Sequence, residues 1–136
     1  MTSTSDTKAF AAKLYAAVNE VIRTGNVDLL DPVIAPDAID RDIGMEPGAT
    51  AIKDAFLGLR ASFPDTRFVI DDMIAEGDKV SLRLTAHATH HGKFMGIEPT
   101  NKAVTWSLID YLRFENGKLV ERWGLVDLAT LTAQLA

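Results

Sequence analysis

The sequence has no cysteine among its 136 residues. This absence excludes disulfide bonds, thiolate nucleophiles and zinc sites built on thiolates. The chain also lacks a Walker phosphate-binding loop and the GxGxxG, GxSxG and HExxH patterns. Nothing therefore supports a nucleotide-binding, dinucleotide-binding, serine-hydrolase or zincin function. Any chemistry must come from separate side chains that line a pocket.

Basic residues are in the minority, because 14 Lys and Arg stand against 19 Asp and Glu, for a formal net charge of −5. This balance disfavours nucleic acid and anionic membrane surfaces as partners. No apolar run approaches the roughly 20 residues that span a bilayer, and the N-terminus lacks the basic and apolar regions of a secretory signal. We therefore expect a soluble, cytoplasmic protein that binds neither nucleic acid nor membranes.

The length and composition predict one folded domain over residues 1–136. Hydrophobic residues make up 47% and charged residues 24% of the chain, which is ordinary globular composition. A chain of this size can bury a core of its own.

The first half of the chain is predicted to be mainly helical. Apolar residues recur at helical spacing over residues 6–24, where Gly25 could cap the end, and again over 50–63. Between them, a short helical turn is expected within residues 26–34 and an extended piece over 37–43.

The second half changes to the two-residue period of strands. Asn116-Gly117 favours a two-residue hairpin turn, and Asp127 could cap a short C-terminal helix. The alternation predicts four strands, over residues 68–75, 80–91, 103–114 and 118–126. Helices followed by such a meander indicate an α+β fold, with helices packed on one face of a curved antiparallel sheet.

The other face of this sheet is expected to carry Ile109 and Tyr111 beside polar residues such as Arg83. It is too apolar for free exposure along its whole length, so we expect a homodimer through this face.

Asp110 is the most informative single residue. It alternates with the same phase as Trp106, Leu108 and Leu112, so its carboxylate should point into the apolar side of the sheet. Two interpretations remain open. Burial could tune the carboxylate for general acid or base work, or Asp110 could form a structural ion pair with Arg122 on the neighbouring strand.

Three histidines, His87, His90 and His91, lie close together in the sequence. Strand alternation turns His90 away from the other two, so a three-histidine metal site is not expected. His90 could be a pocket base or hydrogen-bond donor, or a partly buried residue that closes a strand end.

Asp40 and Asp42 share one face of the short extended segment. Two carboxylates at one rim could serve proton transfer, although aspartates in such pairs are commonly solvated.

Several short motifs occur together and in order. They are FPD at 63–65, EGDKV at 76–80, H-x-G-x-F-x-G-I-x-P-T at 90–100 and R-F-x-x-G-K-L-V-E-x-W-x-x-x-D at 113–127. With them, nearly the whole chain resembles the SnoaL-like polyketide cyclases and ester cyclases of the nuclear transport factor 2-like superfamily.

The resemblance implies a cone-shaped α+β barrel of the nuclear transport factor 2-like or cystatin-like type. A curved antiparallel sheet would wrap around the N-terminal helices and enclose a deep pocket, and such proteins are commonly dimers through the sheet. Cyclases of this family close a polyketide ring by intramolecular aldol condensation, with an acidic residue as general acid/base and without metal or cofactor.

The resemblance carries over unevenly to individual residues. His90 matches the family histidine, while Asp110 and Asp40 fall at polar pocket positions. The acid/base aspartate of the characterised cyclases aligns with Gly124, and Arg122 replaces a common histidine.

We therefore expect a cofactor-free enzyme acting on a small apolar or aromatic carbonyl compound, with Asp110 and His90 as catalytic residues. Arg122 would tune Asp110, Asp40 would bind substrate, and Trp106 and Trp123 would shape the pocket. The alternatives are a non-catalytic binding domain, or an isomerase, dehydratase or epoxide hydrolase on the same fold.

Overall fold

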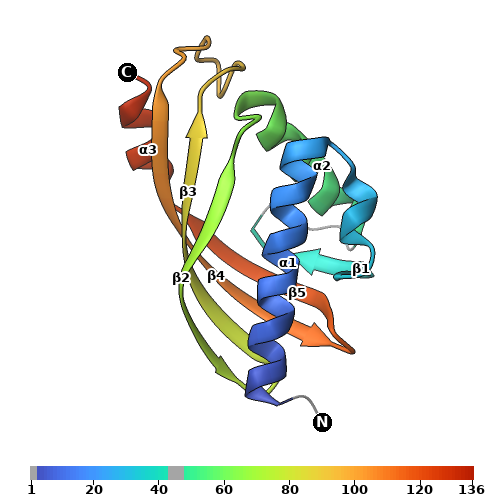
Figure 1. Ribbon diagram of the computed structural model, residues 1–136. Helices are drawn as coiled ribbons and strands as arrows, with labels where there is room; N and C mark the ends of the chain where they lie inside the picture. The colour runs from blue at the N-terminus through green and yellow to red at the C-terminus, as the bar shows by residue number, and fades with distance from the viewer. Residues whose placement is uncertain (1–2, 43–47) are drawn as a thin grey trace.

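A curved sheet wraps around the side on which the first two helices lie (Figure 1). The computed structural model describes residues 3–42 and 48–136. The elements are α1 (Thr4–Thr24), a 3-10 turn η1 (Val27–Leu30), β1 (Ile34–Asp40), α2 (Ala49–Ser62), β2 (Arg67–Glu76), β3 (Lys79–Thr89), β4 (Ala103–Glu115), β5 (Lys118–Val126) and α3 (Leu128–Gln134).

Helix α1 begins and ends where its sequence provides caps. The Ser3 side chain accepts a hydrogen bond from the backbone N–H of Asp6. At the other end Gly25 adopts φ of 77° and its N–H donates to the carbonyl of Val21. The helix buries one face against the sheet, including Ala11, Leu14, Val18, Val21 and Ile22.

The four predicted strands form β2 to β5, and with β1 they make a five-stranded sheet in the order β1-β5-β4-β3-β2. Asn116 and Gly117 both have positive φ, 52° and 79°, so the expected hairpin turn between β4 and β5 is confirmed. On β4 every second side chain from Val104 to Phe114 is buried, and the buried residues of β3 lie opposite them. These two strands carry the centre of the core.

The first strand corrects the prediction of a purely antiparallel sheet. β1 pairs with β5 in parallel, with Asp40 opposite Arg122, so the sheet is mixed. It also begins at Ile34, earlier than the predicted extended piece over 37–43, whose last residue lies outside the described residues. Val33 joins the turn to the sheet, because its N–H donates to the carbonyl of Leu30 and its carbonyl accepts the N–H of Leu119 on β5. No hairpin turn joins β1 to its neighbour, so local sequence does not fix its direction.

The outer face of the sheet exposes several large apolar side chains. The exposed fractions are 52% for Ile109, 42% for Tyr111, 39% for Trp123 and 79% for Leu125. A homodimer through this face stays a prediction. No helix in the described part of the chain is long and apolar enough to cross a membrane.

The connection between β3 and β4 is fixed to the end of α2. The backbone N–H groups of His91 and Gly92 both donate to the carbonyl of Ser62, and the Ser62 hydroxyl donates to the carbonyl of Lys93. Gly92 lies so close that a Cβ atom there would be 2.0 Å from the carbonyl oxygen of Ala61.

Replacing Gly92 should therefore disturb the fold. We expect Gly92→Ala to lower the free energy of unfolding by about 1–3 kcal/mol, because the clash is with backbone that cannot rotate away. Gly58→Ala is the control: it lies inside α2 with nothing within 4 Å of the added carbon. That variant should gain about 0.5–1 kcal/mol. Urea unfolding measures both, and equal effects would contradict the close contact.

Candidate functional site

An internal cavity of about 240 Å³ lies between the helices and the sheet. Among the described residues, its lining is apolar or aromatic except for Asp40, Asp42, Arg122 and the hydroxyl group of Tyr15. The apolar lining comes from elements far apart in the sequence, and it includes Leu14 and Val18 of α1, Ile52 and Phe56 of α2, Trp106 of β4 and Leu131 of α3. The polar groups therefore define the place where chemistry could occur.

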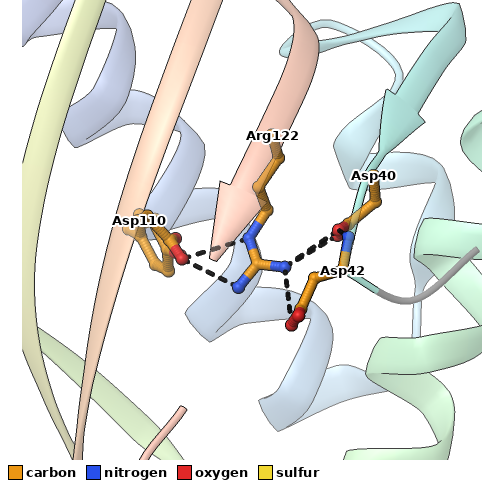
Figure 2. A network of polar contacts seen from close by, with 5 residues as sticks. Asp40, Asp42, Asp110 and Arg122 are labelled. Carbon is orange, nitrogen blue, oxygen red and sulfur yellow. Dashed lines mark hydrogen bonds and ion pairs between the residues drawn. The ribbon is translucent and has the colours of Figure 1, made fainter. Parts of the chain in front are cut away.

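Arg122 is the centre of this polar group (Figure 2). Its Nε and Nη2 atoms donate to Oδ1 of Asp110, at 3.1 and 2.8 Å. Its Nη1 atom donates to both carboxylate oxygens of Asp40, at 3.1 and 2.9 Å. The Oδ2 atom of Asp42 lies farther away, 3.7 Å from Nη1. One guanidinium thus holds carboxylates from β4 and β1, the two neighbours of its own strand β5.

These contacts show how Asp110 is paired. The carboxylate is fully buried and forms the ion pair with Arg122 that the sequence allowed as an alternative. It also accepts a hydrogen bond from the hydroxyl of Tyr15 on α1. Asp110 is not among the residues that line the cavity. Its partners Tyr15 and Arg122 stand at the cavity wall instead.

Asp40 and Asp42 differ in solvent exposure, although their spacing in the sequence places them on the same face. The Asp40 side chain is 5% exposed and bonded to Arg122, which corrects the expectation of a solvated pair. The Asp42 side chain is 37% exposed. Its backbone N–H donates to Oδ1 of Asp40 at 2.9 Å, which holds Asp42 at the edge of the cavity.

Tyr15 is a site residue that the sequence analysis missed. It lies on the buried face of α1 between Leu14 and Val18, so the helical spacing places it inward. The helical spacing showed that Tyr15 points inward, but a tyrosine on the buried face of a helix usually serves only to pack the core. Burial raises the pKa of Tyr15 well above its ordinary value of 10.0, and the negative charge of Asp110 raises it further. Tyr15 therefore remains a neutral hydrogen-bond donor at neutral pH.

Arg122 is kept charged by the same surroundings. Burial by itself lowers the pKa of this guanidinium. The negative charge of Asp110, with further contributions from Tyr15 and Asp40, raises the pKa by more than burial lowers it. The net result is that the pKa of Arg122 is raised above its ordinary value.

Gly124 is required by the position of Arg122. The two residues are two positions apart on β5, and Gly124 lies directly opposite Asp110. A Cβ atom at position 124 would be 2.2 Å from Nη2 of Arg122 and 2.9 Å from Oδ1 of Asp110. The guanidinium thus occupies the space that a side chain at position 124 would need. An aspartate cannot be added there while Arg122 keeps its place.

His90 points inward and is fully buried, whereas His87 and His91 are exposed, as the alternation predicted. Its Nδ1 atom accepts the backbone N–H of Thr100, and its ring packs against Phe63. His90 is not among the cavity-lining residues and makes no contact with Asp110 that would form a catalytic pair. Within the described ranges, no group of three His, Asp or Glu side chains is arranged to hold a metal ion.

The two tryptophans lie on opposite faces of the sheet. Trp106 is buried and lines the cavity. Trp123 is on the outer face, where its ring packs against Tyr111 with the centroids 5.4 Å apart. The expectation that both shape one pocket is therefore wrong for Trp123. Position 123 alternates with Arg122 along β5, so the two side chains point to opposite faces.

The fold and the cavity define a small α+β protein in which a curved sheet and helices surround an apolar cavity. The family model for SnoaL-like polyketide cyclases matches residues 12–135. The chain belongs to this SnoaL-like polyketide cyclase family.

Solved structures agree with this assignment. AclR from Streptomyces galilaeus, proposed to be a hydroxylase, is 32% identical, with a TM-score of 0.84 over 98% of this chain and 97% of that one. IdmH from Streptomyces antibioticus, proposed to be a polyketide cyclase, is 29% identical, with a TM-score of 0.77 over 98% and 99% of the two chains. TsrD from Streptomyces laurentii is 25% identical, with a TM-score of 0.86 over 100% and 98%. A search among curated proteins found no significant match.

The hydrogen bond from Tyr15 to Asp110 should give stability a distinctive pH dependence. At pH 8, Tyr15→Phe should lower the free energy of unfolding by about 1.5–3 kcal/mol, because a charged acceptor loses its donor. The folded protein holds the Tyr15 proton more tightly than the unfolded chain does. Wild type therefore loses this stabilisation as the pH rises above about 10, by about 1.4 kcal/mol per pH unit.

The variant has no hydroxyl to titrate, so the stability gap between it and wild type should narrow between pH 8 and pH 11. Denaturant unfolding at both pH values measures the gap. Tyr111→Phe, on the outer face, is the matched control. A gap for Tyr15→Phe that is equal at both pH values would contradict the assigned contact.

The steric conflict between Arg122 and a side chain at position 124 can be tested separately. Gly124→Ala should lower the free energy of unfolding by about 1–3 kcal/mol, because the new methyl group displaces a guanidinium that is fixed at both ends. Urea unfolding gives the change, and a crystal structure of the variant should find Arg122 moved away from Asp110. Unchanged stability with Arg122 in place would refute the steric conflict.

Proposed function

We propose that the protein is a SnoaL-like enzyme that transfers protons, without a cofactor, to and from a small, largely apolar carbonyl compound in the internal cavity. The observation that carries this proposal is the single polar group, Asp40, Asp42, Tyr15 and Arg122, in a cavity that is otherwise apolar. Pockets of this kind commonly bind the apolar body of a ligand and orient it with a few polar groups. A cavity of about 240 Å³ suits a small ligand.

The proton acceptor in this proposal is Asp42 rather than Asp110. Asp110 takes hydrogen bonds from Tyr15 and from two nitrogens of Arg122, and it does not reach the cavity. Both oxygens of Asp40 accept from Arg122. Within the described residues, the carboxylate of Asp42 accepts no hydrogen bond, and it lines the cavity. A general base must be free to reach its proton, and Asp42 meets this condition best.

Arg122 has the complementary role. Removal of a proton from the carbon beside a carbonyl moves an electron pair onto the carbonyl oxygen and gives an enolate. Asp42 loses its own negative charge when it takes the proton, so the charge on the enolate replaces that of Asp42 beside the fixed guanidinium and adds no further anion to the site. Asp110, Asp40 and Tyr15 act as positioning residues, because they hold Arg122 in place. The enolate can then attack a second carbonyl carbon, and the proton on Asp42 returns to the oxygen of the product.

Hydroxylation is a second candidate, because AclR, which is 32% identical, is proposed to be a hydroxylase, and because Gly124 provides no carboxylate. The two reactions differ in their need for molecular oxygen. Turnover that stops when oxygen is removed favours an oxygen-dependent hydroxylation, whereas cyclisation proceeds without it. A protein that binds ligand but exchanges no proton would instead be a binding domain.

Proton abstraction can be tested without the natural substrate. We expect wild type to accelerate the exchange of the α-hydrogens of 2-tetralone, a small two-ring ketone, for deuterium in D₂O, measured by NMR. Asp42→Asn should lower the rate above background by about 100-fold or more, with unfolding stability unchanged because the side chain is partly exposed. Asp37→Asn, at an exposed aspartate of the preceding strand β1, is the matched control and should keep the wild-type rate.

Asp110→Asn separates the two assignments of the base. If Asp110 only positions Arg122, this variant loses stability as well as activity. Loss of exchange with full stability in Asp110→Asn, together with normal exchange in Asp42→Asn, would return the role of base to Asp110.

A further inference from the structure

The polar group at the cavity carries more negative than positive charge. Three carboxylates, from Asp40, Asp42 and Asp110, surround the one guanidinium of Arg122 (Figure 2). All three carboxylates form ion pairs with this guanidinium, and Asp42 is partly exposed to solvent. The formal charges of the four groups sum to −2, since three acidic groups stand against one basic group.

Arg122 has little capacity left for another anion. A guanidinium has five N–H groups, and four hydrogen bonds to Asp40 and Asp110 already use Nε, Nη1 and Nη2. The Tyr15 hydroxyl at the cavity wall gives its one proton to Asp110. A ligand carboxylate would therefore meet a cation whose charge is already more than balanced.

No other cation in the described residues is available at the cavity wall. Arg122 is the only basic residue among those that line it. Arg41, next to Asp42 in the sequence, is held by two hydrogen bonds to Glu121 at 2.9 and 2.7 Å. Lys53, on α2, is paired with Asp31 at 2.7 Å.

We propose that the cavity selects its ligand by charge: it accepts uncharged or cationic ligands and rejects carboxylates. This inference rests on the proposed function, because it assumes that the cavity is the ligand site. The physical reason is the field of the excess negative charge, which an apolar cavity screens less than bulk water does. Substrates would then be neutral ketones, esters or amides, or amines, and the corresponding free acids would be excluded.

The net charge of the whole chain has the same sign, −5, so the test must separate the local field from the overall charge. Charges more than about 8–10 Å away are largely screened at physiological salt. A change of charge at the cavity should therefore alter the selectivity between neutral, cationic and anionic ligands. An equal change of charge elsewhere on the surface should leave that selectivity unchanged.

Three ligands with the same ring system provide the measurement. They are 2-naphthylmethanol, which is neutral, 2-naphthylmethylammonium, which is cationic, and 2-naphthoate, which is anionic. Calorimetric titration at pH 7 and 0.15 M salt should give a Kd for 2-naphthoate at least about tenfold weaker than for the alcohol, with the amine as tight as the alcohol or tighter. A Kd for 2-naphthoate equal to or tighter than that of the alcohol would overturn the inference.

Asp42→Asn removes one negative charge at the cavity wall without touching the buried pairs. Relative to the alcohol, it should strengthen 2-naphthoate binding severalfold and weaken amine binding. Asp37→Asn removes the same charge from an exposed site on β1 and should change none of the three. Equal shifts in both variants would overturn the inference, since the overall charge would then explain the selectivity.

The outcomes also separate this inference from the function on which it rests. Equal binding of all three ligands, with proton exchange intact, contradicts charge selection alone. Failure of all three to bind contradicts the cavity as a ligand site, and charge selection with it.

Discussion

The ion pairs of Arg122 are the interaction on which the candidate site depends. The guanidinium lies on β5 and bonds to carboxylates on both neighbouring strands, Asp110 on β4 and Asp40 on β1. Buried charges are costly unless they are paired and hydrogen-bonded, and here each partner satisfies the others. Removal of one member leaves the rest buried without compensation. The cluster therefore fixes the position of β1, the strand that no hairpin holds in place.

The same cluster gives a structural reason for the glycine at position 124, where the resemblance implied a carboxylate. The space in which a side chain at 124 would lie is filled by the guanidinium of Arg122. The glycine at 124 and the arginine at 122 thus depend on each other, because the arginine side chain needs the space that the glycine leaves. A carboxylate at the pocket is still present, but it comes from the end of β1 instead of from β5. The family fold accommodates this exchange because β1 and β5 are adjacent.

Much of the fold could be predicted because its signals are local. The spacing of apolar residues in α1, the alternation along β3 and β4, and the Asn116-Gly117 turn each depend on neighbours in the sequence. The inward direction of His90 follows from the same alternation. The parallel direction of β1 could not be predicted in this way, because it depends on pairing with a strand nearly 80 residues later.

The sequence by itself determined the family, the order of the elements and the inward direction of Asp110, because periodicity and motif order are properties of the chain. Tertiary structure alone decided that Asp110 is enclosed by Tyr15 and Arg122, that Asp40 and Asp42 reach the cavity, and that Trp123 lies outside it. A carboxylate's role depends on which atoms surround it. Those atoms come from α1, β1 and β5, which only the folded chain brings together.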